Sequence, residues 1–275
     1  MVSKSTHSNQ QKHLAVLIDA DNAQASIVEG LFEEIAKYGI ASVKRMYGDW
    51  TGPQLGSWKK LMLEHSIQPI QQFAYTKGKN ATDSSLIIDA MDLLYTRRFD
   101  GFCLVSSDSD FTRLAARLRE EGMTVYGFGE QKTPKPFVSA CDKFIYTEIL
   151  RAEEVVEPAS QGEKAPKTTD SVTEMDKQST PPQSAKPAKV PVEFIAKILD
   201  DIAEEDGWAL LATLGTNISK LRPAFDSRLY GHTKLSDLIR SQSKWFELET
   251  RGMSPTGGAV LYARNKNRTL DNQAR

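Results

Sequence analysis

The feature that most constrains the fold is a run of five apolar residues near the start of the chain, Leu14 to Ile18. A strand with one face in water alternates apolar and polar residues, whereas a strand buried on both faces is apolar throughout. The run has the length of a strand, and Asp19 follows it directly. It therefore predicts a central strand of a parallel sheet that helices cover on both sides.

Strand and helix patterns alternate from this run onward. We expect strands at 14–18, 40–47, 67–75, 101–106 and 124–128. We expect helices at 25–38, 55–65, 82–96 and 111–121, with Gly39 and Gly122 as C-terminal caps of the first and last. Strict alternation of this kind predicts an α/β fold with a parallel central sheet between two helical layers.

The composition changes after residue 150. Residues 151–190 contain five prolines and no aromatic residue, so they cannot bury enough apolar surface to offset the entropy of ordering. Beyond them, a helix at 192–205, short elements at 210–221, 233–241 and 246–249, and a strand at 260–263 predict a small winged-helix-like domain. The predicted divisions are a leader at 1–11, a first domain at 12–150, a disordered linker at 151–190, a second domain at 191–265 and a tail at 266–275.

Charge and cysteine content limit the partners and the compartment. Residues 1–150 carry 17 Lys/Arg and 18 Asp/Glu, whereas residues 207–275 carry 11 and 5, which favours a polyanionic partner for the second domain. The two cysteines, Cys103 and Cys141, are expected to be reduced, buried thiols of a cytoplasmic protein. No apolar run approaches the roughly 18 residues that span a bilayer, so no membrane partner is expected.

Acidic residues gather where the predicted strands end. Asp19 ends the first strand, Asp108 and Asp110 follow the fourth, and Asp83 begins the third helix. Because ligands of open parallel sheets bind at the carboxyl ends of the strands, we expect these four side chains to converge. An alternative is that Asp19 and Asp108 only begin loops or cap helices, since aspartate is common at both places.

Converging carboxylates repel one another unless a cation lies among them. Oxygen ligands with few His or Cys nearby favour Mg²⁺ or Mn²⁺ over zinc. Such an ion can activate water and stabilise a phosphoryl transition state. The four acids therefore predict a metal-dependent catalytic site.

Three ordered motifs resemble the NYN domain of the PIN-like nuclease superfamily, most closely its bacterial LabA-like branch. They are Leu17-Ile18-Asp19-Ala20-Asp21-Asn22, Lys77-Gly78-Lys79-Asn80 followed by Asp83 and Asp89, and Ser106-Ser107-Asp108-Ser109-Asp110-Phe111. The resemblance covers residues 12–150 and implies a PIN-like fold and a metal-dependent RNA endonuclease that leaves a 5′-phosphate and a 3′-hydroxyl. It makes Asp19, Asp83 and Asp108 metal ligands and Asp110 a ligand or a neighbouring acid.

Other residues of these motifs are candidates for supporting or substrate-contacting roles. They are Asp21, Asn22, Lys77, Lys79, Asp89 and Ser107. By the resemblance, Asn22 orients the Asp19 carboxylate or touches a phosphate. Asp89 lies about 240° around an ideal helix from Asp83, so the two are not expected to hold one ion, and a helix-packing role for Asp89 stays open.

The second domain resembles the OST-HTH, or LOTUS, domain from Gly207-Trp208-Ala209-Leu210 through Trp245-Phe246-Glu247-Leu248. This resemblance implies RNA binding. The candidate RNA contacts are Lys220, Arg222, Arg228, Tyr230 and Lys234. Trp208, Phe225 and Trp245 are expected in the core.

Two other functions stay open. One is a noncatalytic RNA-binding scaffold that keeps the acidic rim. The other is a haloacid-dehalogenase-type phosphatase, in which Asp19 of the Asp-x-Asp pair attacks phosphate, although Ala23 stands where that class usually has Thr or Val. The leading prediction is a ribonuclease with a tethered domain that recruits RNA.

Overall fold

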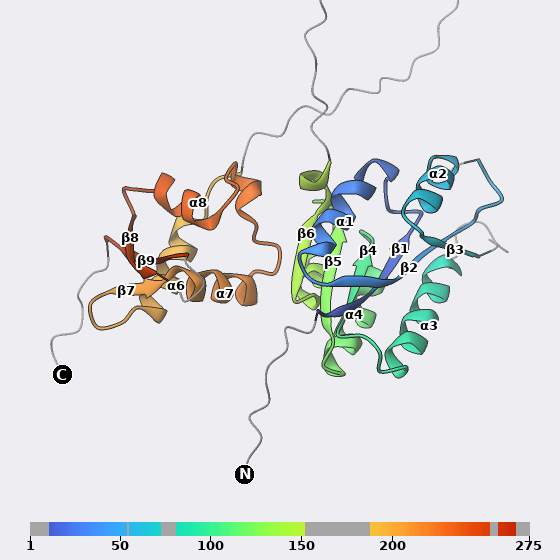
Figure 1. Ribbon diagram of the computed structural model, residues 1–275, viewed down its shortest axis with the longest axis horizontal. Helices are drawn as coiled ribbons and strands as arrows, with labels where there is room; N and C mark the ends of the chain where they lie inside the picture. The colour runs from blue at the N-terminus through green and yellow to red at the C-terminus, as the bar shows by residue number, and fades with distance from the viewer. Residues whose placement is uncertain (1–10, 54, 73–80, 152–187, 254–257, 268–275) are drawn as a thin grey trace, which may run out of the picture.

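The computed structural model describes residues 11–53, 55–72, 81–151, 188–253 and 258–267. Its N-terminal domain is built on a six-stranded parallel sheet in the order β3-β2-β1-β4-β5-β6 (Figure 1). The strands are β1 (His13–Asp19), β2 (Ile40–Gly48), β3 (Gln68–Gln71), β4 (Gly101–Val105), β5 (Thr124–Gly129) and β6 (Lys143–Tyr146). The strand order reverses direction at β1 and β4, so their carboxyl ends mark the expected ligand position of an open sheet.

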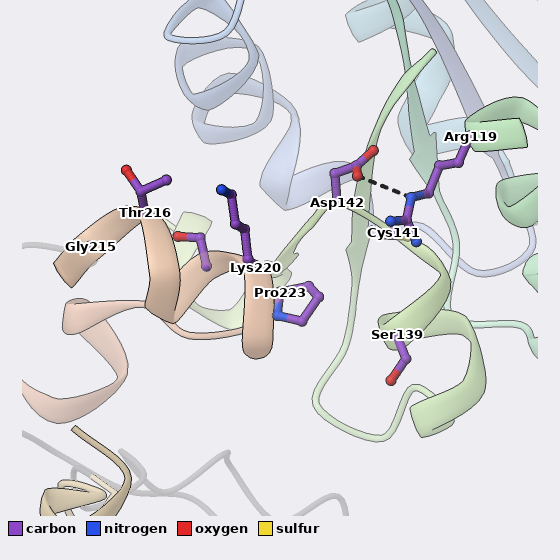
Figure 2. A pocket seen from close by; sticks show the side chains of 9 residues that line it. Arg119, Ser139, Cys141, Asp142, Gly215, Thr216, Lys220 and Pro223 are labelled. Atoms are coloured by element: carbon purple, nitrogen blue, oxygen red, sulfur yellow. Dashed lines mark ion pairs between the residues drawn. The ribbon is translucent and has the colours of Figure 1, made fainter. Parts of the chain in front are cut away.

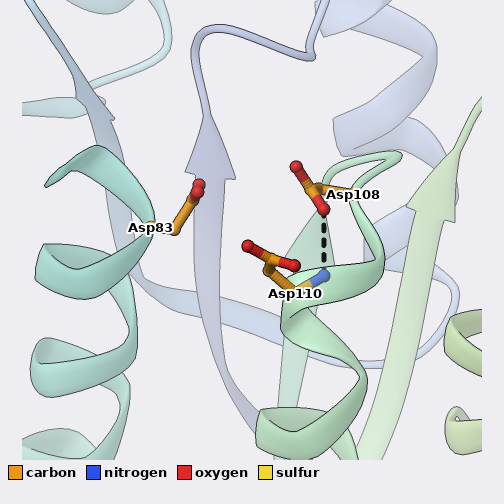
Figure 3. Close-up of side chains that lie close together, drawn as sticks. All are labelled: Asp83, Asp108 and Asp110. Atoms are coloured by element: carbon orange, nitrogen blue, oxygen red, sulfur yellow. Dashed lines mark hydrogen bonds between the residues drawn. The ribbon is translucent and has the colours of Figure 1, made fainter. Parts of the chain in front are cut away.

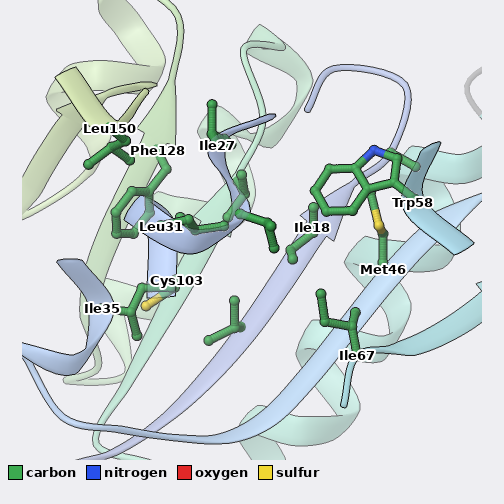
Figure 4. Packing of buried hydrophobic residues seen from close by; sticks show 14 of the residues in the cluster. Ile18, Ile27, Leu31, Ile35, Met46, Trp58, Ile67, Cys103, Phe128 and Leu150 are labelled. Atoms are coloured by element: carbon green, nitrogen blue, oxygen red, sulfur yellow. The ribbon is translucent and has the colours of Figure 1, made fainter. Parts of the chain in front are cut away.

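Helices cover both faces of this sheet. They are α1 (Val28–Ala36), α2 (Gly56–Glu64), α3 (Ala81–Tyr95), α4 (Thr112–Glu120) and α5 (Lys135–Ala140). Successive side chains of β1 point to opposite faces, which divides the interior into two cores. Leu14, Val16 and Ile18 pack with α1 and α2 (Figure 4), whereas Ala15 and Leu17 pack with α3, α4 and α5.

The predicted three-layer α/β/α fold with a parallel sheet is confirmed. The helix α5 and the edge strand β6 were not predicted, because they are too short for a periodic apolar pattern. The predicted first helix is too long, because a 3-10 turn at Ala25–Ile27 precedes α1 and α1 ends at Ala36. The strand predicted at 67–75 is β3, and residues 73–75 lie outside the described part of the chain.

The C-terminal domain combines three helices with an antiparallel sheet in the order β7-β9-β8. Its elements are α6 (Val192–Ile202), β7 (Trp208–Leu210), α7 (Leu211–Leu221), α8 (Leu235–Ser241), β8 (Phe246–Met253) and β9 (Ala259–Asn265). The three helices and the sheet enclose a third core that includes Leu214 and Leu238. The winged-helix-like expectation is confirmed, although α6 ends three residues before the predicted helix.

The predicted leader, linker and tail fall mostly outside the described residues, which omit 1–10, 152–187 and 268–275. Their boundaries therefore remain predictions. Among the helices of the described residues, none combines the length and the apolar composition needed to cross a bilayer.

Candidate active site

The site lies at the carboxyl ends of the neighbouring strands β1 and β4. These strands are in parallel register, with Ile18 opposite Val105, so Asp19 and Ser106 leave the sheet side by side. The 3-10 turn at Ser109–Phe111 then carries Asp108 and Asp110 over the same edge. Asp83 comes to it from the first turn of α3.

Asp19 is fully buried, and hydrogen bonds satisfy its carboxylate. Oδ2 accepts from Asn22 Nδ2 at 2.7 Å and from Ser106 Oγ at 2.8 Å, and Oδ1 accepts from the Asp21 amide at 3.1 Å. Burial raises the pKa of Asp19, while these hydrogen bonds act in the opposite direction. A carboxylate enclosed in this way cannot reach a phosphate directly, which argues against the phosphatase alternative.

Ser106 links two of the acids, Asp19 and Asp108, at the carboxyl edge of the sheet. Its hydroxyl donates to Asp19 and accepts from the Asp108 amide at 3.0 Å. Sequence reasoning selected the adjacent Ser107 and missed Ser106, although both stand in the same motif. The position of Ser106 could have identified it, because Ser106 directly follows Val105, the last residue of β4, where the backbone still has the direction of the strand.

Asp108 is also the N-cap of the 3-10 turn, because its Oδ1 accepts from the Asp110 amide at 2.9 Å. The capping alternative is therefore correct for Asp108, but it does not exclude a role in the site. The cap occupies one side of the carboxylate and fixes its orientation above the sheet.

Asp83, Asp108 and Asp110 form a three-acid group, with one oxygen of each within 4.8 Å of the others (Figure 3). Asp83 and Asp108 are half-buried and Asp110 is exposed, so solvent reaches the group from one side. Burial, together with the negative charges of Asp19, Asp108 and Asp110, raises the pKa of Asp83 to about 6. The group thus concentrates negative charge that a cation would neutralise.

The donor set fits a hard divalent cation, because all three side chains of the group offer carboxylate oxygens. Asp19 lies outside this group but is close enough for its charge to act on Asp83. The predicted direct ligation by Asp19 therefore stays a prediction, and its position favours a buried negative charge behind the group.

The supporting candidates occupy different places. Asn22 donates to Asp19, as one of its two predicted roles requires. Asp21 is exposed, and its amide donates to Asp19. Ser107 is buried and accepts from the Glu130 amide at 2.9 Å, so it ties the end of β4 to the segment after β5. Lys77 and Lys79 lie outside the described residues.

Asp89 faces the body of the domain. Its carboxylate accepts hydrogen bonds from Arg45 and from the hydroxyl of Tyr47, both on β2. Tyr47 is itself fully buried. This arrangement favours the helix-packing alternative, in which Asp89 fastens α3 to the sheet.

The candidate RNA contacts of the C-terminal domain divide into two sets. Lys220, Arg222 and Lys234 are exposed, whereas Arg228 is ion-paired and Tyr230 stacks at a tilt against Phe225, with 5.4 Å between ring centroids.

The expectation that Trp245 lies in the core was wrong, because 39% of this residue is exposed. It lines a cavity of about 660 Å³ together with Phe194 and Arg222. The guanidinium of Arg222 lies 3.8 Å from the ring centroid of Phe194. Aromatic and cationic groups that are exposed together are a common arrangement for nucleobase stacking.

The parallel sheet with an acidic cluster at its carboxyl edge defines a nuclease-like class of protein. The NYN domain model matches residues 13–150, which is half of the chain, and the chain belongs to this family. The OST-HTH/LOTUS domain model matches residues 182–256. Together the two domains make this an RNA-related, nuclease-like protein.

Two solved structures resemble parts of the chain. A protein of unknown function from Vibrio parahaemolyticus is 18% identical, with 50% of this chain and 94% of that chain covered and a TM-score of 0.42. An uncharacterized protein from Nitrosomonas europaea is 34% identical, with 36% of this chain and 100% of that chain covered and a TM-score of 0.28. Both scores are too low to add evidence on the fold or the function. No curated protein matches the chain.

Proposed function

We propose that the protein is a ribonuclease, and specifically an endonuclease, that hydrolyses RNA phosphodiester bonds with Mg²⁺ or Mn²⁺. The observation that carries the proposal is the three-acid group of Asp83, Asp108 and Asp110, in which carboxylate oxygens lie within 4.8 Å of one another at the carboxyl edge of the sheet. Family membership in the NYN domain supports the same reaction class.

Each acid has a distinct place in this proposal. Asp83, Asp108 and Asp110 would hold the cation, and buried Asp19 would add negative charge behind them. Ser106 and Asn22 fix the Asp19 carboxylate, and Ser106 also fixes the loop that carries Asp108. When bound, a divalent cation would stabilise the charge that develops on the scissile phosphate.

The C-terminal domain is proposed to recruit RNA. Its exposed cations Lys220, Arg222 and Lys234 are suited to phosphates, and Trp245 beside Arg222 is suited to an unpaired base. A domain joined to the catalytic domain raises the local concentration of substrate without a new contact at the site. A cytoplasmic location remains a prediction from the cysteines, both of which are free and buried.

The direct test incubates the purified full chain with labelled single-stranded RNA and Mg²⁺ or Mn²⁺. Wild type should cleave, and Asp83→Asn and Asp108→Asn should each lose at least about 100-fold in rate, as expected when charge stabilisation of a transition state is removed. Asp92→Asn is the matched control, because Asp92 is an exposed aspartate of the same helix as Asp83. It should retain the wild-type rate.

Cleavage that persists in both Asp83→Asn and Asp108→Asn would come from a contaminant and would reject the nuclease proposal. A wild-type protein that binds RNA and Mn²⁺ without cleaving RNA would favour the second candidate, a noncatalytic RNA-binding scaffold. Calorimetric titration of Mn²⁺ into the same variants separates loss of the ion from loss of chemistry.

A further inference from the structure

The two domains meet through an ion pair between residues 194 positions apart. Arg228, in the 3-10 turn Ser227–Tyr230 of the C-terminal domain, donates from Nη1 to Glu34 Oε2 at 2.8 Å. Glu34 belongs to α1, and only 4% of its side chain is exposed. A buried carboxylate is costly unless it is paired and hydrogen-bonded, so Glu34 requires partners in this arrangement of the two domains.

Glu34 receives three donors. Lys37 Nζ and Arg228 Nη1 bond to Oε2 at 2.7 Å and 2.8 Å, and the Tyr38 hydroxyl bonds to Oε1 at 2.5 Å. Burial alone would raise the pKa of Glu34, but the three donors lower it to about 2. Of the two cations, Lys37 is 59% exposed at its side chain and Arg228 only 28%. Arg228 is therefore the less solvated cation and the stronger partner.

A second contact lies on the edge strand β6. The amide of Phe144 donates to the carbonyl of Pro223 at 3.0 Å, although the two residues belong to different domains. Beside it, Ala224 packs against the core between the sheet and α3, α4 and α5. An unpaired strand edge invites association with another backbone, and here the segment after α7 supplies one acceptor to it.

A cavity of about 580 Å³ adjoins this contact (Figure 2). Lys220 and Pro223 line it from the C-terminal domain, and Arg119 and Asp142, which form an ion pair, line it from the N-terminal domain. Among the described residues, the contacts between the domains thus include the Arg228–Glu34 ion pair, the Phe144–Pro223 hydrogen bond and the packing of Ala224, next to this cavity. Such an interface depends strongly on its individual ion pairs and hydrogen bonds.

We propose that Glu34, Tyr38 and Phe144 form a docking surface for the OST-HTH domain of the same chain, with Arg228 as its ionic anchor. Figure 1 places that domain beside β6, whereas the acids of the site come from β1, β4 and α3. Docking thus leaves the acidic rim uncovered. Asp226 of the same domain holds Arg228 through Nε and Nη2, and Nη1 bonds to Glu34, whereas Lys220, Arg222 and Lys234 stay exposed.

The Phe144 amide is the reporter for a test by hydrogen exchange, read by NMR on the full chain. Its acceptor lies in the other domain, so the amide returns to solvent when the domains separate. The Asp142 amide is the internal control, because it donates to the Val125 carbonyl at 2.9 Å within the N-terminal domain. Docking predicts that both amides are protected in the wild-type protein.

Glu34→Gln and Arg228→Gln remove the ion pair from opposite sides. Each should speed exchange at Phe144 by on the order of tenfold or more, while exchange at Asp142 stays unchanged. Arg240→Gln is the matched control, because it removes an arginine of the same domain whose partner, Asp237, is in the same helix. It should leave both amides protected.

An unprotected Phe144 amide in the wild-type protein would overturn the docking itself, even if a variant proved too unstable to compare. Protection that persists in both Glu34→Gln and Arg228→Gln would overturn the role of Arg228 as anchor. Protection that increases with protein concentration would assign the contact to a second copy and overturn docking within one chain.

Discussion

The hydroxyl of Ser106 donates a hydrogen bond of 2.8 Å to the carboxylate of Asp19, across the ends of the adjacent strands β4 and β1. The same oxygen accepts from the Asp108 amide at 3.0 Å. One small side chain therefore sets the relative position of a buried acid and an acid of the rim. The geometry of the candidate site depends on this connection as much as on the acids themselves.

Ser106→Ala should remove both hydrogen bonds and leave the Asp19 carboxylate short of a donor. We expect a loss of about 1 to 3 kcal/mol in the free energy of unfolding, a further rise in the pKa of Asp19, and weaker Mn²⁺ binding. Urea denaturation measures the loss of stability, and calorimetric Mn²⁺ titration measures the loss of ion affinity. Ser109→Ala, at an exposed position of the same motif, is the control and should change neither. Unchanged Mn²⁺ affinity in Ser106→Ala would show that the link does not organise the site.

Asp83 should make the stability of the metal-free protein depend on pH. Its folded pKa of about 6 exceeds the ordinary value of 3.8, so the folded state holds the proton more tightly than the unfolded state. The carboxylate therefore contributes a destabilisation that grows as the pH rises from 3.8 to about 6 and is constant above that range.

Asp83→Asn removes this destabilisation. In EDTA at pH 7.5 the variant should be more stable than wild type by about 1 kcal/mol, after allowance for solvent screening of a half-buried group, and the two should converge near pH 4. Urea denaturation across this range provides the measurement, with Asp92→Asn as control. Added Mn²⁺ should reverse the order, since it stabilises the form that binds it. A variant less stable than wild type in EDTA at pH 7.5 would contradict the repulsion described for the three-acid group.

The fold was predictable because the apolar run of β1 is buried on both faces and ends at a polar residue. The positions of Asp19 and Asp108 at strand ends followed from the same pattern. The choice between Ser106 and Ser107 did not follow, because only the backbone path after β4 decides which hydroxyl faces Asp19. Short elements such as β6 carry too few residues for a pattern and are fixed by tertiary packing.

The pairing of Arg228 with Glu34 could not be predicted from the sequence. The two residues belong to domains with separate cores, and no local pattern relates positions so far apart. The sequence instead predicted that Arg228 contacts RNA, because other basic residues lie near it in the sequence. The same reasoning selected Lys234, which is exposed. Burial distinguishes the two cations, and burial at a contact between domains depends on how the domains meet.

Asp89→Asn should lower the stability of the protein and leave Mn²⁺ binding nearly unchanged. It leaves Arg45 without its carboxylate partner, and the side chains of Arg45 and Asp89 are only 25% and 22% exposed. We expect a loss of about 2 kcal/mol in the free energy of unfolding, below the range for fully buried pairs, with Mn²⁺ affinity within about threefold of wild type. Denaturation and titration of the same sample test both parts. A large loss of Mn²⁺ affinity at unchanged stability would contradict the packing role and would indicate that Asp89 belongs to the metal site.

Removal of the C-terminal domain should separate recruitment from chemistry. A chain that ends at Val190 keeps the sheet, the three-acid group and both N-terminal cores, and the second core loses only the packing of Ala224 from the removed domain. Cleavage at saturating RNA should therefore persist, while RNA affinity falls by about tenfold or more.

The dependence of affinity on salt should become shallower in the same truncated chain, because exposed phosphate-binding cations are lost with the domain. Fluorescence anisotropy with labelled RNA at several salt concentrations measures both the affinity and the slope. Glu34→Gln in the full chain is the control, since it also deprives the N-terminal domain of the Arg228 contact but leaves Lys220, Arg222 and Lys234 in place. If the truncated chain kept the full affinity and slope, the RNA-binding surface would have to lie on the N-terminal domain.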